Sequence, residues 1–129
     1  MAVDILIAED EPSILEALTF VLRRAGWTVQ TVTDGEAVMN AVRRESPRVL
    51  VLDIMLPKRS GFEVLKQIRT SEATAALPVL VLTAKGQQQD RQIADEFGAD
   101  SFVTKPYSNV DVVNAVRALL GEPAAAAPR

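Results

Sequence analysis

The chain has 129 residues, 48% of them hydrophobic and 24% charged, which is the composition of one folded domain and excludes a globally disordered chain. Its 14 basic and 17 acidic residues give a net charge of -3, which argues against binding nucleic acid or anionic membranes through bulk charge. The sequence contains neither cysteine nor histidine, which excludes disulfides, thiol catalysis, Ser-His-Asp triads and metal sites built from those residues.

The sequence shows no sign of membrane insertion or export. No apolar run approaches the roughly 18 residues that a membrane-spanning helix needs. The first residues include acids, where a signal peptide would carry a basic start and a longer apolar stretch. We therefore expect a soluble cytoplasmic protein.

The first half of the chain alternates short apolar runs with amphipathic segments. Unbroken aliphatic runs are typical of strands buried on both faces of a parallel sheet, whereas an alternating pattern is typical of an edge strand. Pro12 suits a first helical turn and Gly26 suits a helix end, while Thr33 and Glu36 match a capping box. The predicted elements are a strand at Ile5–Ala8, a helix between Pro12 and Gly26, an edge strand at Trp27–Val32, a helix at Asp34–Glu45 and a strand at Val49–Leu52.

The second half continues the same alternation. Ser60 and Glu63 match another capping box, and Ser108 with Asp111 matches a third. The helix predicted at Gln87–Phe97 has the weakest pattern because its first residues are polar. The remaining predicted elements are helices at Gly61–Ser71, Gln87–Phe97 and Asn109–Leu120, and strands at Val79–Leu82 and Ser101–Thr104.

The order of these elements predicts an α/β fold. Strands that alternate with helices imply right-handed crossovers and a parallel sheet. Five strands fit a flavodoxin-like, doubly wound sheet of order 2-1-3-4-5, with the edge-like second strand and the short fifth strand at its two ends. We expect one domain over residues 1–121 and a disordered tail or linker over residues 122–129, which has two prolines and no periodicity.

Polar residues follow the predicted strands at one edge of the sheet. Glu9 and Asp10 follow the first strand, and Asp53 follows the third. Thr83 follows the fourth strand and Lys105 the fifth. Because the carboxyl ends of parallel strands share one edge, these side chains are expected to converge where the strand order reverses.

This combination predicts phosphoryl chemistry. Three carboxylates in one crevice repel each other, and Mg²⁺ is the hard cation that best offsets such a cluster. A carboxylate beside a cation, a hydroxyl and a lysine can accept a phosphoryl group without a histidine on this chain. Taken singly, each residue would be interpreted as a helix cap, a turn former or a strand-end hydroxyl. Their joint placement at one edge of the sheet favours a site that accepts a phosphoryl group.

Several short motifs contain these polar residues. They are IAEDE at Ile7–Glu11, LDIMLP at Leu52–Pro57 with Gly61, LTA at Leu82–Ala84, GAD at Gly98–Asp100 and TKPY at Thr104–Tyr107. Together these motifs resemble the response-regulator receiver domains of two-component signalling. The resemblance covers about residues 3 to 120 and is closest to the receivers of winged-helix transcription factors.

The resemblance implies a role for each residue of the acidic crevice. Asp53 would accept a phosphoryl group from a histidine kinase or a histidine phosphotransfer protein. Asp10 and Asp53 would bind Mg²⁺ directly, while Glu9 would act largely through water. Met55 would offer its backbone carbonyl to the metal.

The resemblance also implies how the signal leaves the site. Thr83 and Lys105 would contact the phosphoryl oxygens, and a cis peptide bond before Pro106 would place the lysine. Phe102 occupies the position of an aromatic switch, so the output face would comprise the last two helices and the strand between them. An unknown output partner would bind there, and the domain itself would bind no nucleic acid.

Two further expectations concern assembly and lifetime. In the subfamily with winged-helix outputs, paired charges on the output face support a dimer, but Ser101 and Ala115 replace an expected acid and arginine. The chain is therefore expected to be a monomer or a weak, phosphorylation-dependent dimer. Slow loss of the phosphoryl group is expected because Met55 offers no side-chain group to hold an attacking water.

Three other functions fit the sequence less well. A phosphohydrolase of the haloacid dehalogenase type needs a second acid two residues after its nucleophile, and Met55 stands there. A degenerate receiver that only binds partners would lack at least one of the key polar residues, and none is missing. A nucleotide or flavin protein would need a glycine-rich or hydroxyl-rich first loop, and this loop is acidic. We expect a signalling phospho-acceptor rather than an enzyme.

Overall fold

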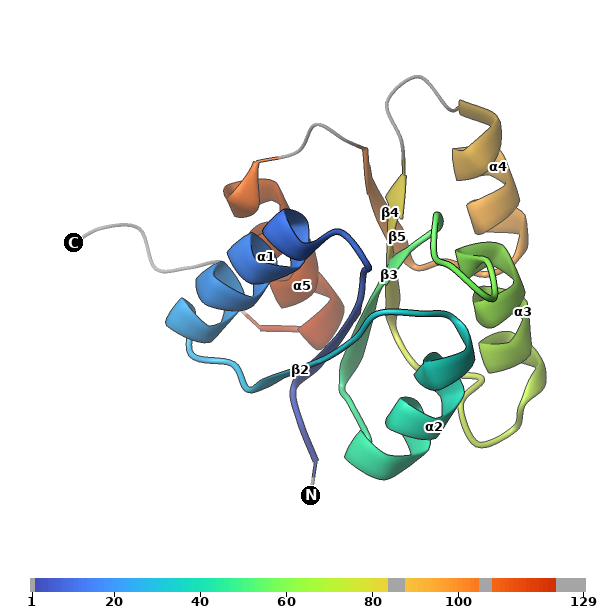
Figure 1. Ribbon diagram of the computed structural model, residues 1–129, viewed down its shortest axis with the longest axis horizontal. Helices are drawn as coiled ribbons and strands as arrows, with labels where there is room; N and C mark the ends of the chain where they lie inside the picture. Colours follow the sequence, from blue (N-terminus) through green and yellow to red (C-terminus); the bar gives the residue numbers. More distant parts are fainter. Residues whose placement is uncertain (1, 84–87, 105–107, 123–129) are drawn as a thin grey trace.

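The computed structural model describes residues 2–83, 88–104 and 108–122. It is a parallel sheet of order β2-β1-β3-β4-β5, so the predicted doubly wound α/β fold is confirmed (Figure 1). The strands are β1 (Ile5–Ala8), β2 (Val29–Val32), β3 (Val49–Asp53), β4 (Val79–Thr83) and β5 (Ser101–Thr104). The helices are α1 (Pro12–Arg24), α2 (Glu36–Glu45), α3 (Gly61–Thr70), α4 (Gln88–Glu96) and α5 (Asn109–Leu120).

The sheet is a central layer with helices on both faces. Helices α1 and α5 cover one face, and α2, α3 and α4 cover the other (Figure 1). Alternate residues of the central strands enter two separate hydrophobic clusters: Leu52 and Val81 face α2 to α4, while Val51 and Leu82 face α1 and α5. Burial on both faces explains why β3 and β4 are continuous aliphatic runs.

Several predicted helix ends are confirmed. The Ser60 hydroxyl accepts a hydrogen bond of 3.2 Å from the Glu63 N–H at the start of α3. Ser108 and Asp111 form both halves of a capping box at the start of α5. Gly26 lies just beyond α1 with φ +104°, a left-handed conformation that glycine adopts without strain.

The predicted start of α2 is wrong by two residues. The helix begins at Glu36, and Thr33 does not cap it. Instead, the Asp34 carboxylate accepts a hydrogen bond of 2.9 Å from the N–H of Ala37. Asp34, rather than Thr33, therefore accepts an N–H of the first turn, and no capping box forms, because Ala37 has no side chain that could complete one.

The edge strand is also shorter than predicted. β2 begins at Val29, and its next two residues, Gln30 and Thr31, are exposed, as an edge position requires. Trp27 is buried instead beside the end of α5, where its indole N–H donates to a Glu122 carboxylate oxygen at 3.2 Å. The alternating pattern could not reveal this contact, because Glu122 is 95 residues away in the chain.

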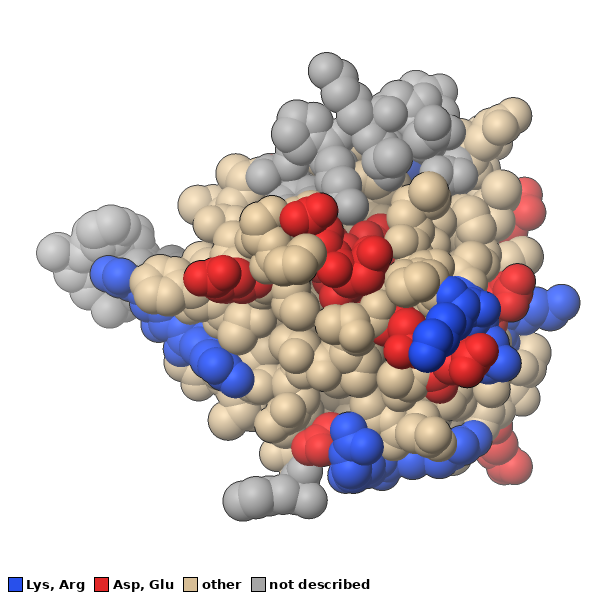
Figure 2. All heavy atoms as spheres, in the orientation of Figure 1, with Lys and Arg blue, Asp and Glu red and all other residues tan. Residues whose placement is uncertain are grey.

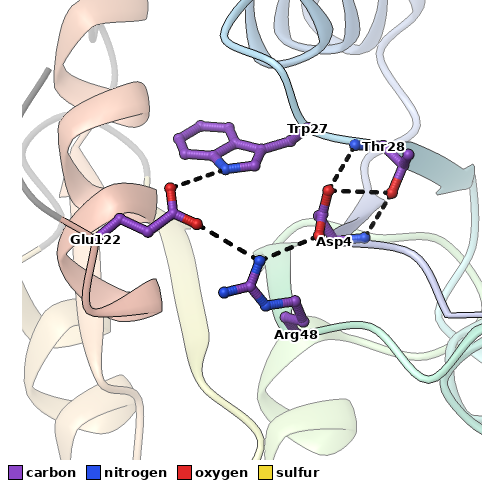
Figure 3. Close-up of polar contacts among 5 residues, drawn as sticks. All are labelled: Asp4, Trp27, Thr28, Arg48 and Glu122. Carbon is purple, nitrogen blue, oxygen red and sulfur yellow. Dashed lines mark hydrogen bonds and ion pairs between the residues drawn. The ribbon is translucent and has the colours of Figure 1, made fainter.

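A network of polar contacts links Asp4, near the start of the described residues, to Glu122, their last residue, at the amino-terminal edge of the sheet (Figure 3). The guanidinium of Arg48 donates to Asp4 at 3.2 Å and to Glu122 at 3.5 Å. Asp4 also accepts a hydrogen bond of 2.9 Å from the N–H of Thr28. Glu122, predicted as the first residue of a tail, thus contacts the domain, and residues 123–129 lie outside the described residues.

Among the side chains that the structure describes, α4 contributes fewer buried residues than the other helices. Within the part whose side chains are described, Ala94 is buried and Ile93 is half-buried. Gln87, the predicted first residue of this helix, lies outside the described residues. None of the described helices is long and apolar enough to cross a membrane.

Candidate functional site

Three carboxylates meet at the carboxyl-terminal edge of the sheet. Glu9 and Asp10 follow β1, Asp53 ends the neighbouring β3, and one oxygen of each lies within 4.8 Å of the others. In Figure 2, acidic side chains gather in the upper half of the face shown, over the ends of these strands. The convergence predicted for these residues is therefore present in the structure.

Two of the three carboxylates are buried. Glu9 is 0% and Asp53 is 3% exposed, while Asp10 is open to solvent. Burying several negative charges together is costly unless a positive charge accompanies them. Carboxylate oxygens at this spacing form the donor set that Mg²⁺ prefers, and the exposed Asp10 leaves a side from which an ion can enter. The described residues thus fit a magnesium ion.

Backbone groups orient the two buried carboxylates. One oxygen of Glu9 accepts the N–H of Asp10 at 3.0 Å, which turns the side chain back over its own loop. One oxygen of Asp53 accepts the N–H of Met55 at 3.0 Å. These contacts hold the Asp53 side chain at the end of its strand, while the Met55 side chain projects outward and is 69% exposed.

A glycine allows the next helix to begin directly against Asp53. The N–H of Gly61 donates to the carbonyl of Ile54 at 2.9 Å. A Cβ atom at this glycine would lie 2.5 Å from the Asp53 carbonyl oxygen, closer than real Cβ atoms approach. The glycine in the predicted motif therefore has a steric reason: it lets α3 support the loop that follows Asp53.

Thr83 lies at the end of β4 and is fully buried. Its hydroxyl donates a hydrogen bond of 3.1 Å to the hydroxyl of Thr104, the last residue of β5. The sequence pattern indicated a role for Thr83 but none for Thr104. The sequence does place both threonines at the ends of predicted strands. Their pairing becomes visible only with the register of β4 and β5, in which Thr83 lies opposite Thr104.

Phe102 is half-buried on β5 and packs against the cluster beneath α4. The guanidinium carbon of Arg91, on α4, lies 4.3 Å from the centre of its ring. Nothing in the sequence pattern indicated this contact. Lys105 and Pro106, predicted to contact the phosphoryl group and to form a cis peptide bond, lie outside the described residues.

Comparison with known proteins identifies the family of this arrangement. Residues 5–117 match the model of the response regulator receiver domain. The chain is 42% identical over 124 residues to the alkaline phosphatase synthesis transcriptional regulatory protein PhoP of Bacillus subtilis, covering 96% of this chain and 51% of PhoP. It is 40% identical over 116 residues to the sensory transduction protein RegX3 of Mycobacterium tuberculosis, covering 90% and 50%. The chain thus spans about half the length of these relatives.

Solved structures agree with the sequence relatives. The receiver domain of NtrX from Brucella abortus superimposes with a TM-score of 0.85 at 26% identity, covering 92% of this chain and 98% of that one. The receiver domain of the sensor histidine kinase PA1611 from Pseudomonas aeruginosa has a TM-score of 0.85 at 25% identity, covering 95% and 100%. That structure has a magnesium ion coordinated in its active site cleft.

Proposed function

Because the chain belongs to the response-regulator receiver family, whose general function is phosphorylation-dependent signalling, we propose that Asp53 is its phosphoryl acceptor. The observation that carries this proposal is the position of Asp53, almost fully buried at the end of β3 with Glu9 and Asp10 beside it. The proposed donor is the phosphohistidine of a histidine kinase or a histidine phosphotransfer protein.

The proposed step exchanges one bond to phosphorus for another. A carboxylate oxygen of Asp53 attacks the phosphorus atom of the phosphohistidine, and the phosphorus–nitrogen bond of the donor breaks. The imidazole nitrogen keeps the electron pair and takes a proton from solvent, and Asp53 becomes an acyl phosphate. The N–H of Met55 orients the attacking carboxylate, so this chain contributes chiefly by positioning.

A magnesium ion is proposed to be held by Asp10, Asp53 and the backbone carbonyl of Met55, with Glu9 acting largely through water. When bound, the ion offsets the negative charge that gathers as carboxylates and a phosphoryl group approach each other. Thr83 and Lys105 are proposed to contact the phosphoryl oxygens. The burial of Thr83 at the end of β4 supports its part in this set.

The proposed output face consists of α4, β5 and α5. The described part of α4 buries few side chains, and an element with few buried contacts can shift at low cost. Phe102, half-buried between this helix and the sheet, is the proposed switch. We also propose that an output partner binds this face and that the chain is a monomer or forms a weak, phosphorylation-dependent dimer. A cytoplasmic location and slow autodephosphorylation are proposed as well.

The test is labelling with a small phosphodonor. The purified chain is incubated with acetyl phosphate and Mg²⁺, and the intact mass is measured. One added phosphoryl group is expected, and none after Asp53→Asn or in the presence of a chelator. Asp95→Asn, which removes an exposed carboxylate from α4, is the matched control and should be labelled like wild type. Labelling of Asp53→Asn at the wild-type level would disprove the assignment.

A further inference from the structure

The hydroxyl of Thr83 already has a partner in this structure. It donates to Thr104 at 3.1 Å, and the two residues are directly paired in the parallel register of β4 and β5. Thr83 is fully buried and Thr104 is half-buried, so water competes little for this hydrogen bond. The contact therefore defines one position of the Thr83 hydroxyl, in which Thr104 is its hydrogen-bond partner.

The same two strands carry the proposed aromatic switch. Side chains alternate along a strand, so Phe102 lies on the same face of β5 as Thr104. Phe102 and Val81, which are register partners, both belong to the cluster beneath α2, α3 and α4. The Thr83–Thr104 pair thus lies two residues further along the two strands than the Phe102–Val81 pair, on the face that α4 covers.

From this geometry we propose that Thr104 is a positioning residue that holds the Thr83 hydroxyl in its resting place. The inference rests on the proposed function, because it concerns the hydroxyl that would contact a phosphoryl group on Asp53. Thr83 can donate its single proton either to Thr104 or to a phosphoryl oxygen. The two states of the switch therefore compete for one hydrogen bond.

The competition has a definite direction. A hydrogen bond between two neutral hydroxyls is weaker than one to a charged phosphoryl oxygen. After phosphorylation, the Thr83 hydroxyl therefore donates to the phosphoryl oxygen instead of to Thr104. Removing the Thr104 hydroxyl leaves a buried donor on Thr83 without its resting partner and raises the free energy of the resting state alone. The acyl-phosphate state loses nothing, so it becomes relatively more favourable.

The test uses beryllofluoride with Mg²⁺ as a non-covalent mimic of the phosphoryl group, with binding followed by NMR. Thr104→Val keeps the shape of the side chain and removes its hydroxyl. It should bind the mimic about two- to tenfold more tightly than wild type, as expected for the loss of one neutral hydrogen bond from the resting state. Thr104→Ser keeps the hydroxyl and should bind like wild type. Thr104→Ala provides a second hydroxyl-free variant should the valine variant fold poorly.

A double-mutant cycle separates this role from a merely structural one. In a Thr83→Val background, Thr104→Val should leave the affinity for beryllofluoride unchanged, because the competing hydroxyl is gone. A structural role would instead weaken binding or leave it unaltered in either background. Unchanged or weaker binding by Thr104→Val overturns the inference, as does a gain that persists without the Thr83 hydroxyl.

Failure of the proposed function has a different signature. If wild type neither binds beryllofluoride nor accepts a phosphoryl group on Asp53, the proposed function is wrong and the inference falls with it. If wild type does both and the Thr104 variants match it, only the inference is wrong.

Discussion

Arg91 on α4 stacks over Phe102 on β5, with its guanidinium carbon 4.3 Å from the ring centre. No ion pair of Arg91 is found within the described part of the chain. Gln92 and Asp95 line the same surface hollow as this pair. The contact links α4, which buries few of its described side chains, to the residue proposed as the switch. In this position Phe102 is half-exposed.

We predict that Arg91 stabilises the half-exposed position of Phe102. Arg91→Met keeps an unbranched apolar stem but removes the charge over the ring. The proposed switch is a turn of the Phe102 side chain from its half-exposed position inward, toward the end of β4. A cation–π contact at an exposed site contributes roughly 0.5–1 kcal/mol, so the population of this inward position should rise about two- to fivefold. Fluorine NMR of the chain labelled with fluorophenylalanine measures that population, with the Phe102 signal assigned from Phe102→Leu.

Arg43 provides a matched control for this prediction. It is an exposed arginine in the last turn of α2, so Arg43→Met changes the net charge equally without touching Phe102. Its spectrum should match wild type at the Phe102 signal. An equal shift in both variants would attribute the effect to net charge and contradict a local contact.

The strand pattern made most of this fold predictable from sequence. The aliphatic runs of β1, β3 and β4 are buried on both faces, and that burial is what makes them continuous. The errors arose where a local signal had a competitor. Asp34, rather than Thr33, accepts an N–H from the first turn of α2, and Trp27 contacts Glu122 instead of lying in the edge strand.

The candidate site was predictable to a different degree at each residue. Glu9, Asp10 and Asp53 could be grouped because strand ends in a parallel sheet must meet at one edge. Side-chain pairs across that edge were not predictable, since they depend on strand register and on rotamers. The hydrogen bond from Thr83 to Thr104 is such a pair.

Asp4 is predicted to make stability depend on pH. The N–H of Thr28 and, to a smaller extent, Arg48 favour the charged carboxylate and hold the pKa of Asp4 below its ordinary value, against an opposing effect of burial. Because the folded-state pKa is the lower one, this stabilisation is complete above the unfolded-state pKa of about 4 and is lost as the pH falls through the folded-state pKa.

The variant Asp4→Asn tests this dependence. It should lower the free energy of unfolding by about 1 kcal/mol near neutral pH, measured by urea denaturation, because it weakens charge-assisted hydrogen bonds at a partly exposed site. The difference from wild type should shrink once the pH is well below the ordinary carboxyl range. Glu45→Gln, which removes a carboxylate that pairs with the exposed Arg44, should show little difference at any pH. A gap between wild type and Asp4→Asn that is constant across pH would contradict the prediction.

Gly61 is predicted to be essential for the geometry around Asp53. In Gly61→Ala the new Cβ would meet the Asp53 carbonyl oxygen at 2.5 Å and the Cα of Ile54 at 2.6 Å. Relieving this overlap must move the start of α3 or the end of β3, at a cost of about 1–3 kcal/mol in unfolding free energy. Calorimetric titration should also show weaker Mg²⁺ binding, because Asp53 moves with its strand.

Gly121 offers the contrast for that experiment. It ends α5 with φ +70°, and nothing lies within 4 Å of a Cβ placed there. Gly121→Ala should therefore destabilise the fold through backbone strain alone and leave the Mg²⁺ affinity unchanged. Equal losses of metal affinity in the two variants would mean that general destabilisation, rather than the position of Asp53, controls the site.

Met55 is predicted to prolong the life of the proposed acyl phosphate. Hydrolysis requires a water in line with the bond between Asp53 and phosphorus, and enzymes that cleave such bonds quickly orient that water with an amide or acid side chain. Met55 is two residues from the acceptor, and its exposed thioether is a poor hydrogen-bonding group. Met55→Asn should therefore speed the decay of the phosphorylated chain several-fold in a time course of intact mass, whereas Met55→Leu should decay like wild type. Equal decay of all three chains would show that this side chain does not control the lifetime.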